Sequence, residues 1–220
     1  MPVPGYILTA LAAYLLGSIP FGFLVAKARG IDIRSVGSGN IGATNALRVL
    51  GKPAGVFVLL MDVLKGFVAV KCLPALMVHL AITTFTTLVE PEEIRALEVI
   101  AGICAVLGHN YTCWLKFKGG KGIATTAGVY LALAPWPLLI ALIAFILAVA
   151  LTRYISVGSI SGAIALPAAV WIRSPHNIFL GIVTTALGAL AIYKHKPNIH
   201  RLMAGTENRF GQKKSLEEKK

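Results

Sequence analysis

Charged residues are scarce in this sequence, and acidic ones are the scarcest. Only 14% of the 220 residues are charged, and 9 aspartates and glutamates stand against 21 lysines and arginines. Soluble domains carry roughly 25% charged residues, so the low content excludes an ordinary soluble protein. Together with 56% hydrophobic residues, it indicates an integral membrane protein.

Cysteine and aspartate are also rare, and each shortage excludes a class of site. The three cysteines, Cys72, Cys104 and Cys113, are odd in number and lack the spacing of metal ligands. Cys72 and Cys104 fall in apolar stretches, where cysteine behaves as a small hydrophobe. The two aspartates, Asp32 and Asp62, are too few for the metal-binding cluster of a phosphotransferase that uses a nucleotide-activated lipid. We therefore expect no disulfide, no metal site and no cofactor.

Apolar stretches that can cross a bilayer, which takes about 20 helical residues, recur along the chain. They predict an all-α polytopic membrane bundle of about seven transmembrane helices. The predicted spans are 4–27, 54–78, 94–110, 121–134, 136–152, 156–172 and 177–194. Pro74 can break the second span, which leaves the path of residues 73–93 open. Residues 1–210 are expected to form a single membrane domain, and residues 211–220 a disordered basic tail.

Basic residues are distributed unevenly between the two predicted membrane sides. If the N-terminus lies outside, the segments 27–52, 111–121, 153 and 194–220 share one side and hold 17 of the 21 lysines and arginines. The positive-inside rule makes that side, and the C-terminus, cytoplasmic. The net charge of +12 then follows from topology and attraction to anionic lipid, and we expect no nucleic-acid partner.

A polar, glycine-rich loop from Ser35 to Arg48 follows the first span. It contains the pattern GxGxxG at Gly37, Gly39 and Gly42. That pattern indicates a dinucleotide-binding fold only between a strand and a helix, and this chain offers no βαβ unit. The match is a consequence of glycine content.

We interpret this loop as a phosphate-binding nest that leads into a short helix over about 41–50. On that helix Ile41, Asn45 and Arg48 share a face, and a guanidinium can bind phosphate through two parallel hydrogen bonds. The alternative is a plain cytoplasmic loop whose serines and asparagines act as turn residues and caps. The candidate substrate-binding residues are Ser35, Ser38, Gly39, Asn40, Asn45 and Arg48.

A second glycine-rich segment, Phe117 to Gly122, follows the sequence Gly108-His109-Asn110. Lysines supply positive charge, and the glycines let the backbone approach a ligand. Residues 123–133 read as a helix whose first N–H groups would point at a bound anion. His109, at the cytoplasmic end of a span, can act as a general base, bind a phosphate oxygen or cap its helix. The candidates here are His109, Lys118, Gly119, Gly120, Lys121 and Gly122.

Two further groups of polar residues stand out. Asp62 and Lys65 form an i, i+3 pair inside a predicted span, where ionised side chains are costly unless paired; a functional site and a structural ion pair are equally consistent. After the last span, a short helix is expected to begin at Pro197. The candidates in this segment, with a positive-inside anchor as the alternative, are His195, Asn198, Arg201 and Glu207.

These motifs together resemble the bacterial membrane acyltransferases that use acyl phosphate to acylate glycerol 3-phosphate. The resemblance runs from near the N-terminus to Glu207. It rests on Gly17-Ser18-Ile19-Pro20-Phe21-Gly22, the Ser35 loop, Asp62-x-x-Lys65-Gly66, Gly108-His109, the block 117–125 and His195-x-x-Asn198-Ile199-x-Arg201-Leu202 with Gly205-x-Glu207. The chain departs from the family pattern at Thr112, Trp114 and Lys116.

The resemblance implies an enzyme of the bacterial inner membrane with its active site facing the cytoplasm. The implied substrates are acyl phosphate and glycerol 3-phosphate, taken in the presence of membrane lipid and without an obligate protein partner. The products would be 1-acyl-glycerol 3-phosphate and inorganic phosphate, the first step of phospholipid synthesis. We expect His109, Lys118 and Arg48 to be the catalytic residues, while His109, His195 and the donor phosphate remain open as proton acceptors.

The absence of one motif argues against acyltransferases that use thioester donors. Many glycerol-phosphate acyltransferases that use thioester donors carry H-x-x-x-x-D, and no histidine here has aspartate five residues later. A transporter for an organic phosphate is the main rival from another class. Such carriers often contain two related halves, and we find no internal repeat.

Overall fold

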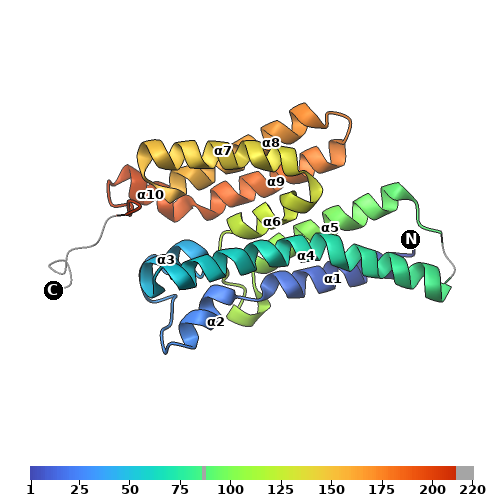
Figure 1. Ribbon diagram of the computed structural model, residues 1–220, viewed down its shortest axis with the longest axis horizontal. Coiled ribbons are helices and arrows are strands. Elements are labelled where there is room, and N and C mark those ends of the chain that lie inside the picture. The colour runs from blue at the N-terminus through green and yellow to red at the C-terminus, as the bar shows by residue number, and fades with distance from the viewer. Residues whose placement is uncertain (86–87, 212–220) are drawn as a thin grey trace. The chain divides into compact units, whose positions relative to one another are not determined.

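The computed structural model describes residues 1–85 and 88–211, and within these residues every regular element is a helix (Figure 1). The all-α prediction is therefore confirmed. The chain divides into two compact units, Met1–Pro135 and Trp136–Lys220, which are described separately. The expectation of one domain over residues 1–210 stays a prediction, and nine of the ten predicted tail residues, 212–220, lie outside the described residues.

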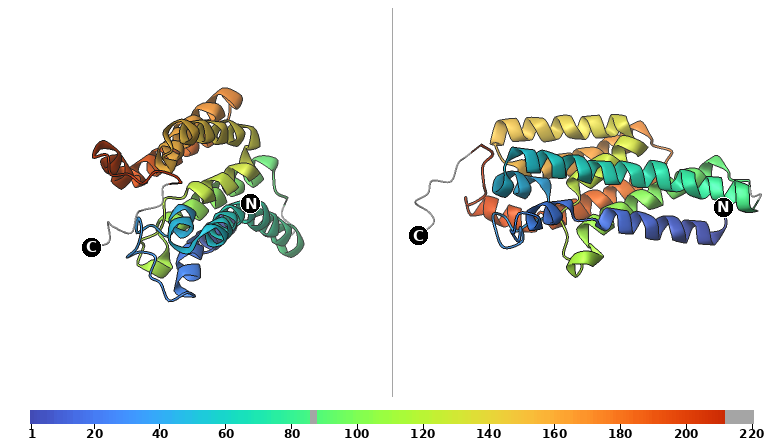
Figure 2. Two further views of the ribbon diagram at one scale, coloured as in Figure 1. Left: turned by 60° about the vertical axis from the view of Figure 1, so that its left-hand side comes forward. Right: turned by 60° about the horizontal axis from the view of Figure 1, so that its bottom comes forward.

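The two longest helices of the first unit are α4 (Lys52–Phe85) and α5 (Pro91–Asn110). Its other elements are α1 (Val3–Ser18), α2 (Phe21–Lys27), α3 (Ala43–Leu50), the 3-10 turn η1 (Cys113–Leu115) and α6 (Ile123–Leu133). Helix α1 packs against α5 and α4, and α4 also packs against α3 and α6. Figure 2 shows α1 running alongside α4.

The second unit contains four helices. They are α7, which begins at the boundary (Pro135–Thr152), α8 (Ile155–Arg173), α9 (Ile178–Lys194) and α10 (Lys196–Met203). Helices α8 and α9 pack side by side (Figure 1). The chain bends by 50° between α9 and α10, and Pro197 lies in the first turn of α10, where its missing N–H costs nothing.

Helices occupy all seven predicted spans, with altered bounds. Among the described residues, four helical stretches are long and apolar enough to cross a membrane, or five if α9 and α10 form one bent span. The first predicted span is interrupted at Ile19 and Pro20, between α1 and α2. Helix α4 runs past Pro74 to Phe85, so the possible break at that proline, which the sequence left open, does not occur. The boundary of α6 agrees with the predicted 123–133.

Glycines let α4 and α6 approach each other backbone to backbone. A Cβ on Gly66 of α4 would overlap the carbonyl oxygen of Thr125, and one on Gly128 of α6 would overlap that of Val63. Small residues at helix interfaces are typical of membrane proteins, because apolar side chains gain little by leaving lipid for another helix. This contact places the start of α6, and the glycine-rich segment before it, beside the polar pair of α4.

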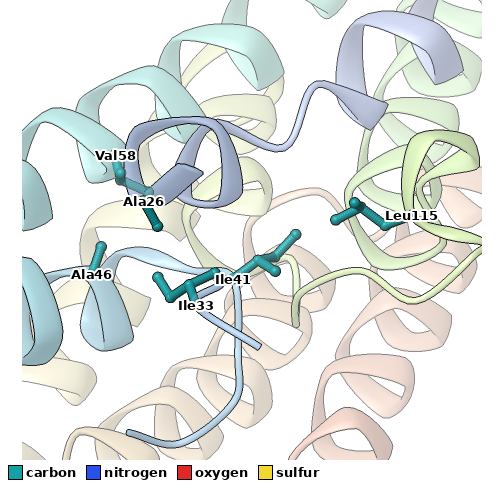
Figure 3. Close-up of a cluster of buried hydrophobic side chains, with 6 residues drawn as sticks. All are labelled: Ala26, Ile33, Ile41, Ala46, Val58 and Leu115. Carbon is teal, nitrogen blue, oxygen red and sulfur yellow. The ribbon is translucent and has the colours of Figure 1, made fainter. Parts of the chain in front are cut away.

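A cluster of buried apolar side chains holds the Ser35 loop against the helices (Figure 3). Its members are Ala26, Ile33, Ile41, Ala46, Val58 and Leu115. Ile41 precedes α3 and is 4% exposed. The prediction that Ile41 lies on the short helix, on one face with Asn45 and Arg48, is therefore wrong: the helix begins at Ala43, after Gly42 adopts an extended backbone.

Candidate functional site

The Ser35 loop is organised by one buried amide. Asn45, on the first turn of α3 and 1% exposed, accepts a hydrogen bond from the Ser38 N–H at 2.8 Å. Its Nδ2 donates to the carbonyls of Ile33 at 3.2 Å and Val36 at 3.1 Å. A buried amide whose two ends are both satisfied fixes the loop in one shape. The role of Asn45 as a substrate contact stays a prediction, and its visible role is to hold the loop.

The backbone of this loop turns at two glycines. Gly37 and Gly39 have φ of 63° and 70°, values that glycine adopts without strain. Asn40 Oδ1 accepts from the Gly42 N–H at 2.9 Å, and Ser35 Oγ donates to the Asp32 carbonyl at 2.9 Å. The structure thus shows the turn contacts of the alternative interpretation, without a side-chain cap on α3 in the part of the chain that it describes. Ser35, Gly39 and Arg48 are exposed at the surface.

An ion pair that the sequence did not single out borders the loop. Arg34 donates through Nε and Nη2 to the two carboxylate oxygens of Asp32, at 2.9 and 2.7 Å. These hydrogen bonds lower the pKa of Asp32 to about 2. The Arg34 guanidinium also lies over the ring of Phe23, 5.0 Å from its centre. Asp32 therefore stays ionised, and Arg34 balances its negative charge next to the loop that is proposed to bind anions.

The second glycine-rich segment lies on the C-terminal end of α5. The N–H groups of Gly119 and Gly120 donate to the carbonyls of Asn110 at 3.2 Å and His109 at 3.0 Å. A Cβ on Gly120 would overlap the His109 ring at Nε2. Glycine is required at both positions because the segment packs closely on α5. The two N–H groups already donate to carbonyls of the protein, so a bound anion would have to accept from groups other than these two.

Lysines on this segment are the groups that face outward. Lys118 is exposed and Lys121 is half-buried. The preceding turn holds Lys116 and Phe117 in the left-handed region, at φ of 54° and 61°, a conformation that is uncommon for residues with side chains. Gly122, with φ of 79°, ends the segment immediately before α6.

His109 joins the Asp62–Lys65 pair to form one buried cluster. Lys65 Nζ lies 2.8 Å from Asp62 Oδ1, 3.0 Å from His109 Nδ1 and 2.9 Å from the carbonyl oxygen of Ile19. The side chains of Asp62 and Lys65 are 3% and 2% exposed, and that of His109 is 6% exposed. The ion pair and the histidine were predicted as two separate features, because Lys65 and His109 are 44 residues apart in the sequence.

In the second unit the polar residues gather around Glu207. Its Oε1 accepts from Asn198 Nδ2 at 2.8 Å and from Ser156 Oγ at 3.1 Å, and its Oε2 accepts from Arg201 Nε at 2.7 Å. The structure brings three of the four predicted residues of this segment into direct contact and adds Ser156, which the sequence did not indicate. His195 is 2% exposed, and its Nδ1 lies 2.8 Å from the Ala191 carbonyl oxygen.

We expect the Glu207 contacts to be lost in acid. Burial raises the pKa of Glu207, but the hydrogen bonds from Asn198 and Arg201 outweigh it and place the pKa below the ordinary 4.5. A lowered pKa contributes stability that is present above the ordinary value and is lost as the pH falls through the folded value. Hydrogen exchange of residues 204–210 should therefore accelerate, beyond its intrinsic pH dependence, as the pH falls below the ordinary 4.5 and through the lowered pKa of Glu207. Glu207→Gln should remove that dependence, and a wild-type segment that stays protected in acid would contradict the assignment.

Comparison with known proteins gives one consistent result. The family model described as glycerol-3-phosphate acyltransferase matches residues 7–205. A glycerol-3-phosphate acyltransferase of Desulforamulus reducens is 44% identical over 210 residues, covering 95% of this chain and 97% of the relative. One of Trichlorobacter lovleyi is 48% identical over 198 residues, covering 90% and 94%.

Solved structures agree with the sequence relatives. The glycerol 3-phosphate form of PlsY (YgiH), described as an integral membrane glycerol 3-phosphate acyltransferase, is 38% identical with a TM-score of 0.80 and covers 94% of this chain and 96% of its own. Its lysophosphatidic acid form is 37% identical with a TM-score of 0.77, covering 94% and 95%.

Proposed function

Because this chain belongs to the glycerol-3-phosphate acyltransferase family, we propose that it transfers a fatty acyl group from acyl phosphate to glycerol 3-phosphate. The products are 1-acyl-glycerol 3-phosphate and inorganic phosphate, which makes this the first step of phospholipid synthesis. The observation that carries the proposal is the match of residues 7–205 to the family model, supported by the similar structures described in glycerol 3-phosphate and lysophosphatidic acid forms.

The choice of acyl phosphate as donor rests on the residues of this chain. No histidine is followed five residues later by aspartate, so the acid that orients a histidine base in many thioester-dependent enzymes is missing from that position. Acyl phosphate is a mixed anhydride with a good leaving group. It can therefore be attacked directly, without a covalent acyl-enzyme.

In this reaction the hydroxyl oxygen of glycerol 3-phosphate attacks the acyl carbonyl carbon. The new ester C–O bond forms, the bond from the acyl carbon to the phosphate oxygen breaks, and the hydroxyl proton leaves to an acceptor. The protein contributes positioning and charge stabilisation. We assign phosphate binding to Arg48, Lys118 and Lys121, together with the hydroxyls of Ser35 and Ser38. The Ser35 hydroxyl, which donates to the Asp32 carbonyl in the structure, must rotate to donate to phosphate.

The proposed arrangement in the membrane follows the distribution of charge. We propose seven crossings, an external N-terminus and a cytoplasmic C-terminus, in the bacterial inner membrane. Under this topology 17 of the 21 basic residues lie on the cytoplasmic side, as the positive-inside rule requires. The Ser35 loop, the glycine-lysine segment and the residues around Glu207 then all meet the cytoplasm, where glycerol 3-phosphate is supplied.

The experiment uses the full chain purified in detergent, with palmitoyl phosphate and glycerol 3-phosphate. Phosphate and lysophosphatidate should appear one to one, and palmitoyl-CoA should give neither. Turnover with the thioester would overturn the donor assignment. A well-folded preparation with no turnover from either donor would overturn the enzyme reading, and uptake of glycerol 3-phosphate into vesicles would then favour a transporter.

We expect the last ten residues to be dispensable for this activity. Just before them, the Phe210 N–H donates a hydrogen bond to the Arg153 carbonyl. The sequence of residues 211–220 mixes lysines with glutamates and contains no apolar run. A chain that ends at Phe210 should keep kcat/KM within about twofold of the full chain, since truncation is commonly tolerated at chain ends. A large loss in the same assay would assign the tail a role.

A further inference from the structure

The buried cluster of Lys65, Asp62 and His109 decides which nitrogen of the histidine carries the proton. An ammonium group has three N–H donors and no acceptor. Lys65 Nζ has three acceptors at hydrogen-bond distance: Asp62 Oδ1 at 2.8 Å, the Ile19 carbonyl at 2.9 Å and His109 Nδ1 at 3.0 Å. Two of these contacts, to the Ile19 carbonyl and to His109 Nδ1, have hydrogen-bond geometry, whereas the contact to Asp62 is an ion pair whose Oδ1 has no hydrogen-bond partner among the described residues. Because an ammonium group can only donate, Nδ1 is the acceptor in its contact with Lys65.

The charge of Lys65 is well supported in this position. Asp62 supplies the counter-charge within the same turn of α4, and the ring of Phe21 lies 5.6 Å from Nζ. An uncompensated charge at such a buried site would be costly, and here the two opposite charges compensate each other at 2.8 Å. If Nδ1 of His109 were protonated, its hydrogen bond to Asp62 would span 3.5 Å, which is long for N–H···O. The Nδ1–H group and the Lys65 ammonium would then be two donors facing each other at 3.0 Å.

From this geometry we propose that Lys65 is a positioning residue that fixes His109 as the tautomer protonated at Nε2. When Nδ1 of a neutral imidazole accepts, the proton lies on the other nitrogen. That nitrogen faces Gly120 of the glycine-lysine segment. His109 therefore presents a hydrogen-bond donor to the anion bound at this segment and does not accept the hydroxyl proton of the substrate.

His195 provides a contrast within the same chain. Its Nδ1 lies 2.8 Å from the carbonyl oxygen of Ala191, and a carbonyl can only accept. The proton of neutral His195 is thus on Nδ1, and its Nε2 bears the lone pair. The two buried histidines carry opposite tautomers, each set by the group that meets Nδ1.

This inference rests on the proposed function for its catalytic meaning, but the tautomer itself can be measured without turnover. We would record ¹⁵N spectra of the full chain labelled at histidine, in detergent at neutral pH, and identify His109 by the signal lost in His109→Gln. The expected result is a protonated Nε2 and an unprotonated Nδ1 for His109, with the reverse for His195. A His109 protonated at Nδ1 would overturn the proposal, whatever the enzyme assay shows.

Substitutions at His109 test the donor role in catalysis. The glutamine amide places an N–H near the position of Nε2, whereas asparagine reaches only as far as Nδ1. We expect His109→Gln to keep kcat/KM within about tenfold, and His109→Asn to lose about 100-fold or more, mainly in kcat. Equal losses of about 100-fold in both variants are the result for a proton acceptor and would overturn the proposal.

The role of Lys65 is tested with its counter-ion removed as well. The double variant Lys65→Met with Asp62→Asn avoids leaving a buried unpaired charge. We expect its His109 signal to move toward a mixture of tautomers and kcat to fall at least about tenfold. Lys71→Met with Glu98→Gln removes another α4–α5 ion pair, with a 2.9 Å contact, and should change neither. An unchanged His109 signal in the Lys65 double variant would show that the lysine does not set the tautomer.

Discussion

Arg48→Ala should lower kcat/KM by an amount equivalent to about 2–4 kcal/mol of transition-state stabilisation. Arg48 lies on the last turn of α3 and is exposed, so under the proposed function it can meet the phosphate of a substrate. A basic residue at the end of a helix also stabilises the helix dipole, but that contribution is only about 0.3–1 kcal/mol. The size of the effect therefore separates substrate binding from helix stabilisation.

The matched control for Arg48 is Arg29→Ala. Arg29 Nη1 donates to the Leu50 carbonyl at 2.8 Å, so this variant removes a positive charge from the same end of α3 without removing a proposed substrate contact. Both variants would be assayed with palmitoyl phosphate and glycerol 3-phosphate after their insertion and thermal stability are checked. Unchanged turnover in folded Arg48→Ala would remove this residue from the site.

Gly120→Ala should reduce kcat/KM by about 100-fold, because a displacement of about 1 Å in a positioning group is sufficient for such a loss. The added methyl would overlap the imidazole of His109, and either the ring or the glycine-lysine segment must move. Overpacking of this kind also costs about 1–3 kcal/mol in stability, so the thermal midpoint should fall together with the activity.

A second substitution identifies the source of the Gly120 effect. In Gly120→Ala combined with His109→Ala the overlapping ring is absent, so the thermal stability should recover relative to Gly120→Ala alone while activity stays low. Gly162→Ala on α8, where the nearest atom to the new methyl is 3.3 Å away, serves as a mild control. Wild-type turnover in Gly120→Ala would mean that this packing does not position the site.

Local patterns were sufficient to predict the helices but not the contacts between distant segments. The bounds of α6 and the start of α10 follow from glycine, proline and apolar periodicity, all of which act over a few residues. The sequence left open whether α4 continues through Pro74, as it does, because neighbouring helices in a membrane protein can re-satisfy the backbone group that proline frees.

The same distinction applies to the candidate site. The functional roles of the candidate residues stay predictions, and the sequence did not show what each side chain contacts. Asn45 was taken as a ligand contact, while its amide is used by three backbone groups whose positions depend on the path of the loop. The contact between His109 and Lys65 exists because α4 packs beside α5. The hydrogen bond from Ser156 to Glu207 exists because the chain after α10 returns to the start of α8.

The buried ammonium of Lys65, which contacts Ile19, Asp62 and His109, also affects how the chain is made. Ile19 and Asp62 have already been synthesised when Lys65 leaves the ribosome, but His109 follows 44 residues later. A helix carrying aspartate and lysine near its centre enters lipid at a cost of about 2.5–3.5 kcal/mol for each charge. Under the proposed seven-span topology, helix α4 is thus a poor candidate for release into the bilayer on its own. We expect its entry to be coupled to that of α1 before it and α5 after it, so that the buried cluster assembles as the chain is inserted.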